Sequence, residues 1–105
     1  MLSFGVFNPA LTASVRNLVL SDSAAVRFTR HAEAEMDNDG FDHADVLWCL
    51  QKGNAFGPEM QNKQLRANVL HRGLHIRVVI AGLDGAQENW NTLEKIKVIT
   101  VMVAK

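Results

Sequence analysis

The spacing of apolar and polar residues divides the 105-residue chain into a helical first half and a sheet-forming second half. Asn8-Pro9 offers a helix cap followed by proline, which suits the first helical position. Apolar residues then recur at helical spacing, so we expect a helix from Pro9 to Leu20. Its apolar stripe consists of Leu11, Val15, Leu18 and Val19. This stripe is expected to pack against the core or against another subunit.

The stretch from Phe28 to Lys52 predicts two short helices joined at Gly40, which can take the positive φ that ends a helix. Thr29 is a suitable N-cap for the first of them, and its buried edge would be formed by Phe28, Ala32 and Met36. Asp42 can cap the second, where a hydrophobic staple is available from Phe41 and Val46. These two helices should decide which face of the following sheet is covered.

The second half has the two-residue period of strands. Ala55-Phe56 begins a short edge strand or loop that Gly57-Pro58 interrupts. Leu65–His71 and Leu74–Ala81 predict a hairpin with Arg72-Gly73 as a two-residue turn. That register puts six apolar side chains on one face by pairing Leu65 with Ile80, Ala67 with Val78, and Val69 with Ile76. The opposite face then carries Arg66, Asn68, Leu70, His75, Arg77 and Val79.

The C-terminal part of the chain is expected to contain a surface loop and a central strand. Gly82–Glu94 is a polar connection that contains Asp84-Gly85 and a lone aromatic residue, Trp90. Ile96–Val103 is an almost continuous β-branched run, which is typical of a strand buried on both faces.

Composition narrows the class of protein. Eleven basic and eleven acidic residues cancel, so nucleic-acid binding would require basic groups gathered on one face. The single cysteine, Cys49, excludes an internal disulfide and is expected to be a buried thiol in a reducing compartment. Met1–Leu20 lacks a basic n-region, and no segment has the ~20 apolar residues of a membrane span. We therefore expect a cytoplasmic protein.

Motifs for metal, nucleotide or nucleophile chemistry are missing from the sequence. His71 and His75 are four residues apart, but they flank a hairpin turn and should point to opposite faces. Neither an HExxH motif, a glycine-rich phosphate loop nor a GxSxG elbow occurs. We expect neither a metal nor a cofactor.

The remaining polar groups suit cleavage of a phosphodiester. Such a reaction needs a base for the ribose 2′-hydroxyl, an acid for the leaving oxygen and cations for the phosphate. Arginine suits the phosphate because its guanidinium donates two hydrogen bonds at once. The chain offers Arg30 and His31 on a helix, Arg66, Arg77 and His75 on the hairpin, and Thr100 in the last strand. Each has an ordinary alternative, since His31 and Glu35 form a surface pair on a helix, exposed arginines solvate a sheet, and threonine favours strands.

Several short motifs resemble the DUF4258 family. They are Phe-Thr-Arg-His-Ala from Phe28, a Met five residues after the His, Gly-Phe-Asp-His-Ala-Asp-Val from Gly40 with a Leu and a Gly following, a hairpin, and a closing Val-Ile-Thr-Val. That family is similar to RelE/ParE- and BrnT-type toxins of the barnase–EndoU–colicin–RelE group of metal-independent ribonucleases. The similar region runs from about Phe28 to Val103, so residues 1–24 would be a helical extension of a single domain over 1–105, with a core at 25–105.

The resemblance implies an α+β domain with N-terminal helices packed on a twisted, mostly antiparallel sheet of about four strands. It implies catalytic roles for His31, Arg66 and Thr100, and we expect Arg30, Arg77 and His75 to bind substrate. One position departs from the pattern, because many members carry Arg before the Met of the first helix, where this chain has Glu35. An anion in that place would weaken phosphate binding by charge repulsion.

Three functions are therefore compared. The first is a toxin-like ribonuclease of a bacterial toxin–antitoxin pair, with RNA as substrate and an antitoxin as partner. The second is a catalytically silent module that binds a protein, encoded by a phage or other mobile element, as Glu35 and Trp90 suggest. The third is a homo-oligomer that pairs through the amphipathic first helix.

Overall fold

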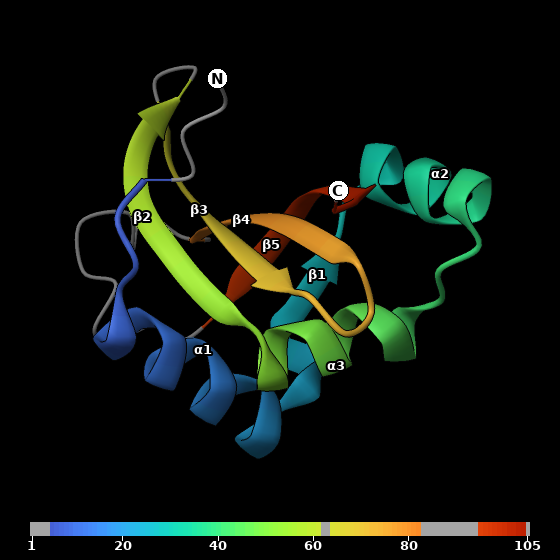
Figure 1. Cartoon of the computed structure of the whole chain (residues 1–105). Helices are drawn as coiled ribbons and strands as arrows, with labels where there is room; N and C mark the ends of the chain where they lie inside the picture. Colours follow the sequence, from blue (N-terminus) through green and yellow to red (C-terminus); the bar gives the residue numbers. More distant parts are fainter. Residues whose placement is uncertain (1–4, 62–63, 83–94, 105) are drawn as a thin grey trace.

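The computed structural model describes residues 5–61, 64–82 and 95–104, and within them three helices and five strands form one α+β unit (Figure 1). The predicted connection from Gly82 to Glu94, with Asp84-Gly85 and Trp90, lies outside these ranges except for Gly82, which ends a strand. The elements are α1 (Pro9–Ser21), η1 (Ser23–Ala25), β1 (Val26–Phe28), α2 (Arg30–Asp39), α3 (His43–Lys52), β2 (Asn54–Gln61), β3 (Gln64–His71), β4 (Ile76–Gly82) and β5 (Ile96–Val103).

The five strands form one mixed sheet in the order β1-β5-β4-β3-β2. β1 runs parallel to β5, and every other neighbouring pair is antiparallel. The predicted α+β class is confirmed, but the expected four-stranded sheet with all helices ahead of it is wrong. The missed strand is β1, which lies between α1 and α2. Its three residues are too few to show an alternating pattern.

Helices cover one face of the sheet. α1 packs against α3 and β2, and α3 packs against β3 and β4 (Figure 1). α2 stands apart from them and packs against β5, close to the C-terminal end of the chain. We call the face opposite α1 and α3 the second face; no helix of the described residues lies across it.

The predicted helix caps are confirmed. The side chains of Asn8, Thr29 and Asp42 each accept a hydrogen bond from a backbone N–H in the first turn of α1, α2 and α3. At α3 the cap is reciprocal, because Asp45 accepts from the backbone N–H of Asp42 at 3.0 Å. Gly40 ends α2 in the left-handed conformation, with φ of 75°.

The β3–β4 hairpin has a different register from the predicted one. Ala67 pairs with Ile80, Val69 with Val78, and His71 with Ile76, so four residues, Arg72 to His75, form the turn. The strand is displaced by two residues, and a shift of two leaves every side chain on its predicted face. The exception is His75, which lies in the turn at φ of 55° and not on the sheet face.

The N-terminal helix is part of the central core. Leu11, Val15 and Val19 are buried in the same cluster as the side chains of α3 and the sheet. Of the two alternatives for this stripe, packing on the core is therefore the observed one. The homo-oligomer prediction loses its basis, because the apolar stripe it required is used inside the monomer.

The edge strand that Gly57-Pro58 was predicted to interrupt is present and extends beyond these two residues. β2 runs from Asn54 to Gln61 with a register shift between Phe56 and Glu59. Its outer edge is paired near its start by the segment ahead of α1, where Asn8 N–H donates to Ala55 O and Gly57 N–H donates to Val6 O, each at 2.9 Å.

Gly53 is required for space and not for its backbone angles. Its φ of −81° suits any residue, but a Cβ there would lie 2.6 Å from the carbonyl oxygen of Cys49 and 2.7 Å from that of Leu70. We predict that Gly53→Ala lowers the free energy of unfolding by about 1–3 kcal/mol, the usual effect of overpacking. Gly73→Ala is the matched control, because the added methyl would meet the partly exposed ring of His71 and no backbone atom. Urea unfolding that gives equal stabilities for the two variants would contradict this explanation.

Cys49 is a buried thiol, as predicted, and no part of it is exposed. Its Sγ donates weakly to the carbonyl oxygens of Val69 and Ile76 at 3.7 and 3.8 Å. Burial raises the pKa of the thiol from its ordinary 9.0 to about 12.

This raised pKa predicts a loss of stability at alkaline pH. Between pH 9 and 12 the unfolded chain ionises the thiol while the folded chain keeps it protonated, so stability falls as pH rises. Relative to Cys49→Ala, the wild type should lose about 1.4 kcal/mol of unfolding free energy between pH 7 and pH 10. A stability difference between the two proteins that stays constant over this range would show that the thiol does not contribute.

Candidate functional site

The second face of the sheet carries most of the predicted sheet-borne site residues. Strand register places Arg66 of β3, Arg77 of β4 and Thr100 of β5 on this face. Thr100 lies directly opposite Val79, and Arg66 lies directly opposite Ala81. With strands ~4.8 Å apart and residues rising ~3.3 Å, the Cα atoms of Arg66 and Thr100 are about 12 Å apart. These residues therefore share a face without touching, and a substrate would have to lie between them.

Arg66 is held with an unsatisfied donor. Its Nε is buried and has no hydrogen-bond partner within the described residues. Its cross-strand neighbour on β2 is Glu59, which pairs with it in register. Buried nitrogen donors are almost always paired in folded proteins, and the Nε of Arg66 departs from this rule.

Arg77 is more firmly fixed. Its Nε donates to Oδ1 of the buried Asn68 at 2.9 Å. Burial lowers the pKa of the Arg77 guanidinium below its ordinary value, because desolvation disfavours the charged form. The side chain thus contributes a positioned positive charge at the centre of the second face.

His31 lies at the edge of β5, beside the strand that carries Thr100. β1 pairs only with Ile96–Val98, so beyond Val98 the edge of β5 that faces away from β4 has no strand of the described residues beside it. α2 takes that place, and Glu35 Oε1 accepts a hydrogen bond from Val101 N–H at 3.1 Å. The same oxygen lies 3.3 Å from His31 Nε2, and the His31 side chain is 68% exposed. His31 is therefore both oriented by a carboxylate and open to solvent.

Glu35 has a structural function that the sequence did not reveal. Its carboxylate is directed at the sheet edge, and only 26% of its side chain is exposed. The Glu35 carboxylate thus accepts a hydrogen bond from Val101 N–H and pairs with His31. An i,i+4 spacing on a helix suggests the pair with His31, but it gives no sign of a strand 66 residues away.

The two remaining predicted residues lie apart from this group. Arg30 is exposed in the first turn of α2, next to His31. His75 is in the β3–β4 turn and does not join Arg66 and Arg77 on the second face.

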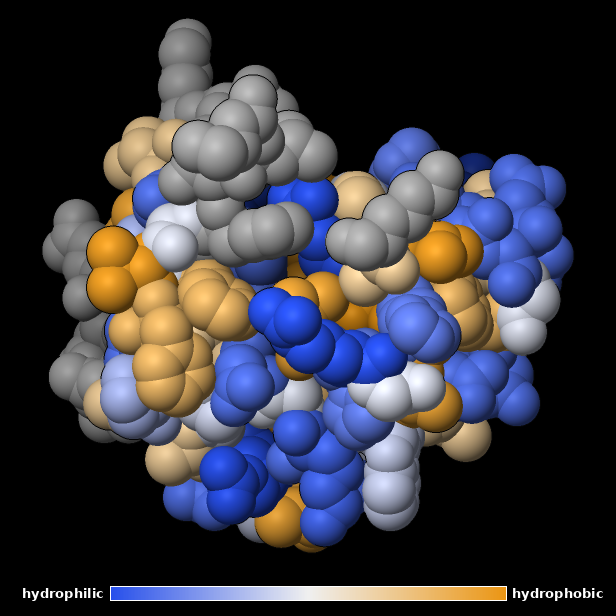
Figure 2. Space-filling model, viewed as in Figure 1, coloured by the Kyte–Doolittle hydropathy of each residue, from blue (hydrophilic) through white to orange (hydrophobic). Residues whose placement is uncertain are grey.

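Charge is separated across the molecule even though its formal sum is zero. Register places four cations and one carboxylate on the second face: Arg27, Arg66, Arg77, Lys97 and Glu59. Six of the eleven acidic residues fall between Glu33 and Asp45 on α2, α3 and their junction, and the region of α2 is mainly hydrophilic in Figure 2. Sequence reasoning missed Arg27 and Lys97, because it did not recognise β1 and so could not place them together.

The bond from Val101 to Glu35 yields a prediction for stability. Glu35→Ala should cost about 1–2 kcal/mol of unfolding free energy, because it leaves the Val101 N–H without its acceptor. Glu35→Gln keeps a carbonyl oxygen in place and should recover most of this loss. Glu33→Ala is the control, since Glu33 is 52% exposed and forms a surface ion pair with His43. Equal stability of the Glu35→Ala and Glu33→Ala variants would exclude the edge-capping role.

Within the described ranges, no group of three or more His, Cys, Asp or Glu side chains is placed so that it could hold a metal ion. None of the helices there is long and apolar enough to cross a membrane. Comparison of the chain with protein-family models, with curated proteins and with solved structures finds no match. Its function is therefore inferred from the positions and chemistry of its own residues.

Proposed function

We propose that this protein is a toxin-like, metal-independent ribonuclease, with the second face and the adjoining end of α2 as its RNA site. The observation that carries the proposal is Arg66, whose buried Nε has no partner within the described residues and lies on the same face as Thr100. An RNA phosphate supplies the anionic oxygens that such a guanidinium lacks.

Each predicted residue has a role in this reaction. His31, oriented by Glu35, removes the proton from the ribose 2′-hydroxyl, and the resulting oxyanion attacks the adjacent phosphorus. The bond from phosphorus to the 5′-oxygen breaks, leaving a 2′,3′-cyclic phosphate, and the leaving 5′-oxygen takes up a proton from water. Arg66 binds the phosphate, with Arg77 and Arg30 adding positive charge. The Thr100 hydroxyl hydrogen-bonds the substrate, and His75 contacts RNA that extends towards the hairpin turn.

Glu35 does not oppose this role in the way that its charge alone suggests. Its carboxylate is bonded to the edge of β5 and to His31, and therefore does not stand on the phosphate-binding face. A carboxylate bonded to one ring nitrogen of a histidine also fixes the orientation of the ring.

The finer fold assignment belongs to the same proposal. Helices on one face of a largely antiparallel sheet, with a second face that carries arginines, agree with a RelE-like domain of the barnase–EndoU–colicin–RelE group. We place the protein in the bacterial cytoplasm, where RNA and an antitoxin partner are available.

RNA cleavage by the purified protein tests the mechanism. His31→Ala should lower the rate of cleavage about 10²–10⁴-fold, the usual effect of losing a general base. His43→Ala is a closely matched control, because His43 Nε2 lies 3.4 Å from Glu33 and the side chain is 59% exposed. Cleavage that is unaffected by His31→Ala, or equally reduced by both substitutions, would remove His31 from the mechanism.

The second candidate is a catalytically silent module that binds a protein. The acidic region from Glu33 to Asp45 favours it, since a concentrated negative surface suits a basic partner. Expression separates the two candidates. A ribonuclease toxin should arrest growth unless its antitoxin is co-expressed, whereas a silent module should be tolerated.

A further inference from the structure

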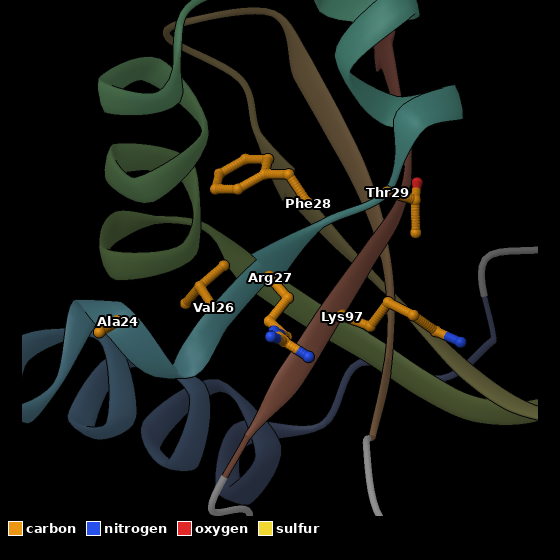
Figure 3. Close-up of a pocket in the computed structure, with 6 residues that line it drawn as sticks. All are labelled: Ala24, Val26, Arg27, Phe28, Thr29 and Lys97. Carbon is orange, nitrogen blue, oxygen red and sulfur yellow. The ribbon is translucent and has the colours of Figure 1, made fainter.

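Two cations that are far apart in the sequence lie side by side at the β1 edge of the sheet. The parallel register puts Arg27 of β1 directly opposite Lys97 of β5. Neighbouring strands are ~4.8 Å apart, and side chains at paired positions leave the same face. Figure 3 shows Val26 and Phe28 directed towards the helices, while Arg27 and Lys97 extend on the other side. The second face thus ends in a pair of adjacent positive charges.

None of the described residues that line the hollow beside this pair is a carboxylate. A hollow of about 510 Å³ is lined by Ala24, Val26, Arg27, Phe28, Thr29 and Lys97 (Figure 3). Neither Arg27 nor Lys97 forms an ion pair with a carboxylate of the described residues. Like charges directly opposite each other on neighbouring strands repel. This arrangement becomes favourable when an anion lies between them.

Among the described polar groups around the hollow, the side chains of Arg27 and Lys97 are the ones that can bind an anion. The Thr29 hydroxyl is already used, because it accepts from Ala32 N–H at 3.1 Å and donates to Ile99 O at 3.3 Å. Thr29 is also the N-cap of α2, so the positive end of that helix adjoins the hollow and adds to its positive potential.

The pair continues a line of residues that crosses the sheet. Arg27, Lys97, Ala81 and Arg66 are successive register partners on β1, β5, β4 and β3. Three strand intervals separate Arg27 from Arg66, or about 14 Å. Ala81, which is fully buried, lies between Lys97 and Arg66 in this line. A single small anion would contact the cations at one end of this line, whereas a polyanion would contact the cations at both ends.

We propose that Arg27 and Lys97 form a second phosphate-binding site, which holds the backbone of the RNA strand about 14 Å from the phosphate at Arg66. The site rests on the proposed function, since RNA is taken to be the ligand. In this arrangement the RNA runs from Arg66 across β4 and β5 towards β1. Arg27 and Lys97 contribute to the affinity for RNA and take no part in the chemical step.

Binding of a 2′-O-methyl RNA oligonucleotide tests this site without cleavage, because its blocked 2′-oxygen cannot attack. Fluorescence anisotropy is measured between 50 and 200 mM salt for the full chain and for Arg27→Gln/Lys97→Gln. Loss of two phosphate contacts should reduce the slope of log K against log salt by about 1.4, so the fall in affinity over this range becomes about sevenfold smaller. Arg16→Gln/Lys52→Gln removes the same charge from exposed positions on α1 and α3 and should leave the slope nearly unchanged.

The outcomes separate this site from the catalytic proposal. Absence of RNA cleavage by the wild type, together with intact binding of the oligonucleotide, would refute the catalytic mechanism and leave the phosphate site standing. Equal slopes for the two double variants, or no binding by the wild type at 50 mM salt, would overturn the phosphate site. Binding of a polyglutamate peptide in place of RNA, lost in Arg27→Gln/Lys97→Gln, would also overturn it and identify an acidic protein segment as the ligand.

Discussion

The arrangement of this molecule depends on how the outer edge of β5 is covered. β1 pairs with three residues at the start of β5 and then stops, which leaves the backbone groups further along without a neighbouring strand. Unpaired strand edges promote association with other chains, and proteins cover or charge them. Here α2 follows directly on β1, lies along the exposed part, and gives Val101 N–H an acceptor in Glu35. The same contact brings His31 beside the strand that carries Thr100.

Much of the local structure could be predicted from the sequence, because capping and turn preferences act over a few residues. Asn8, Thr29, Asp42 and Gly40 each have the predicted role. β5 begins and ends where its β-branched run does. The hairpin register was displaced by two residues, since pattern alone did not favour the four-residue turn over a two-residue turn.

The pairing of segments that are distant along the chain could not be predicted from the sequence. β1 is three residues long, so its pairing with β5 and the meeting of Arg27 with Lys97 had no local signal. Glu35 was interpreted as a departure from a family pattern, although its main contact is a backbone group on another element. Zero net charge likewise concealed the separation between an acidic region on α2 and α3 and a sheet face rich in arginine and lysine. Such separation orients the approach of a charged ligand even when the overall charge offers no attraction.

The place of β5 in the sheet has a consequence for biosynthesis. This last strand lies between β1 and β4 and also supports α2, so the ribosome must make it before the sheet can close. Thr29 and Ile99, which are joined by a hydrogen bond, are 70 residues apart along the chain. Contacts over such separations form late, because the loop between them must first be closed. A nascent chain that ends before Ile96 would contain His31 and Arg66 but would lack β5, the strand that lies between them in the proposed site. Any activity that depends on this site would therefore begin only after β5 has been synthesised.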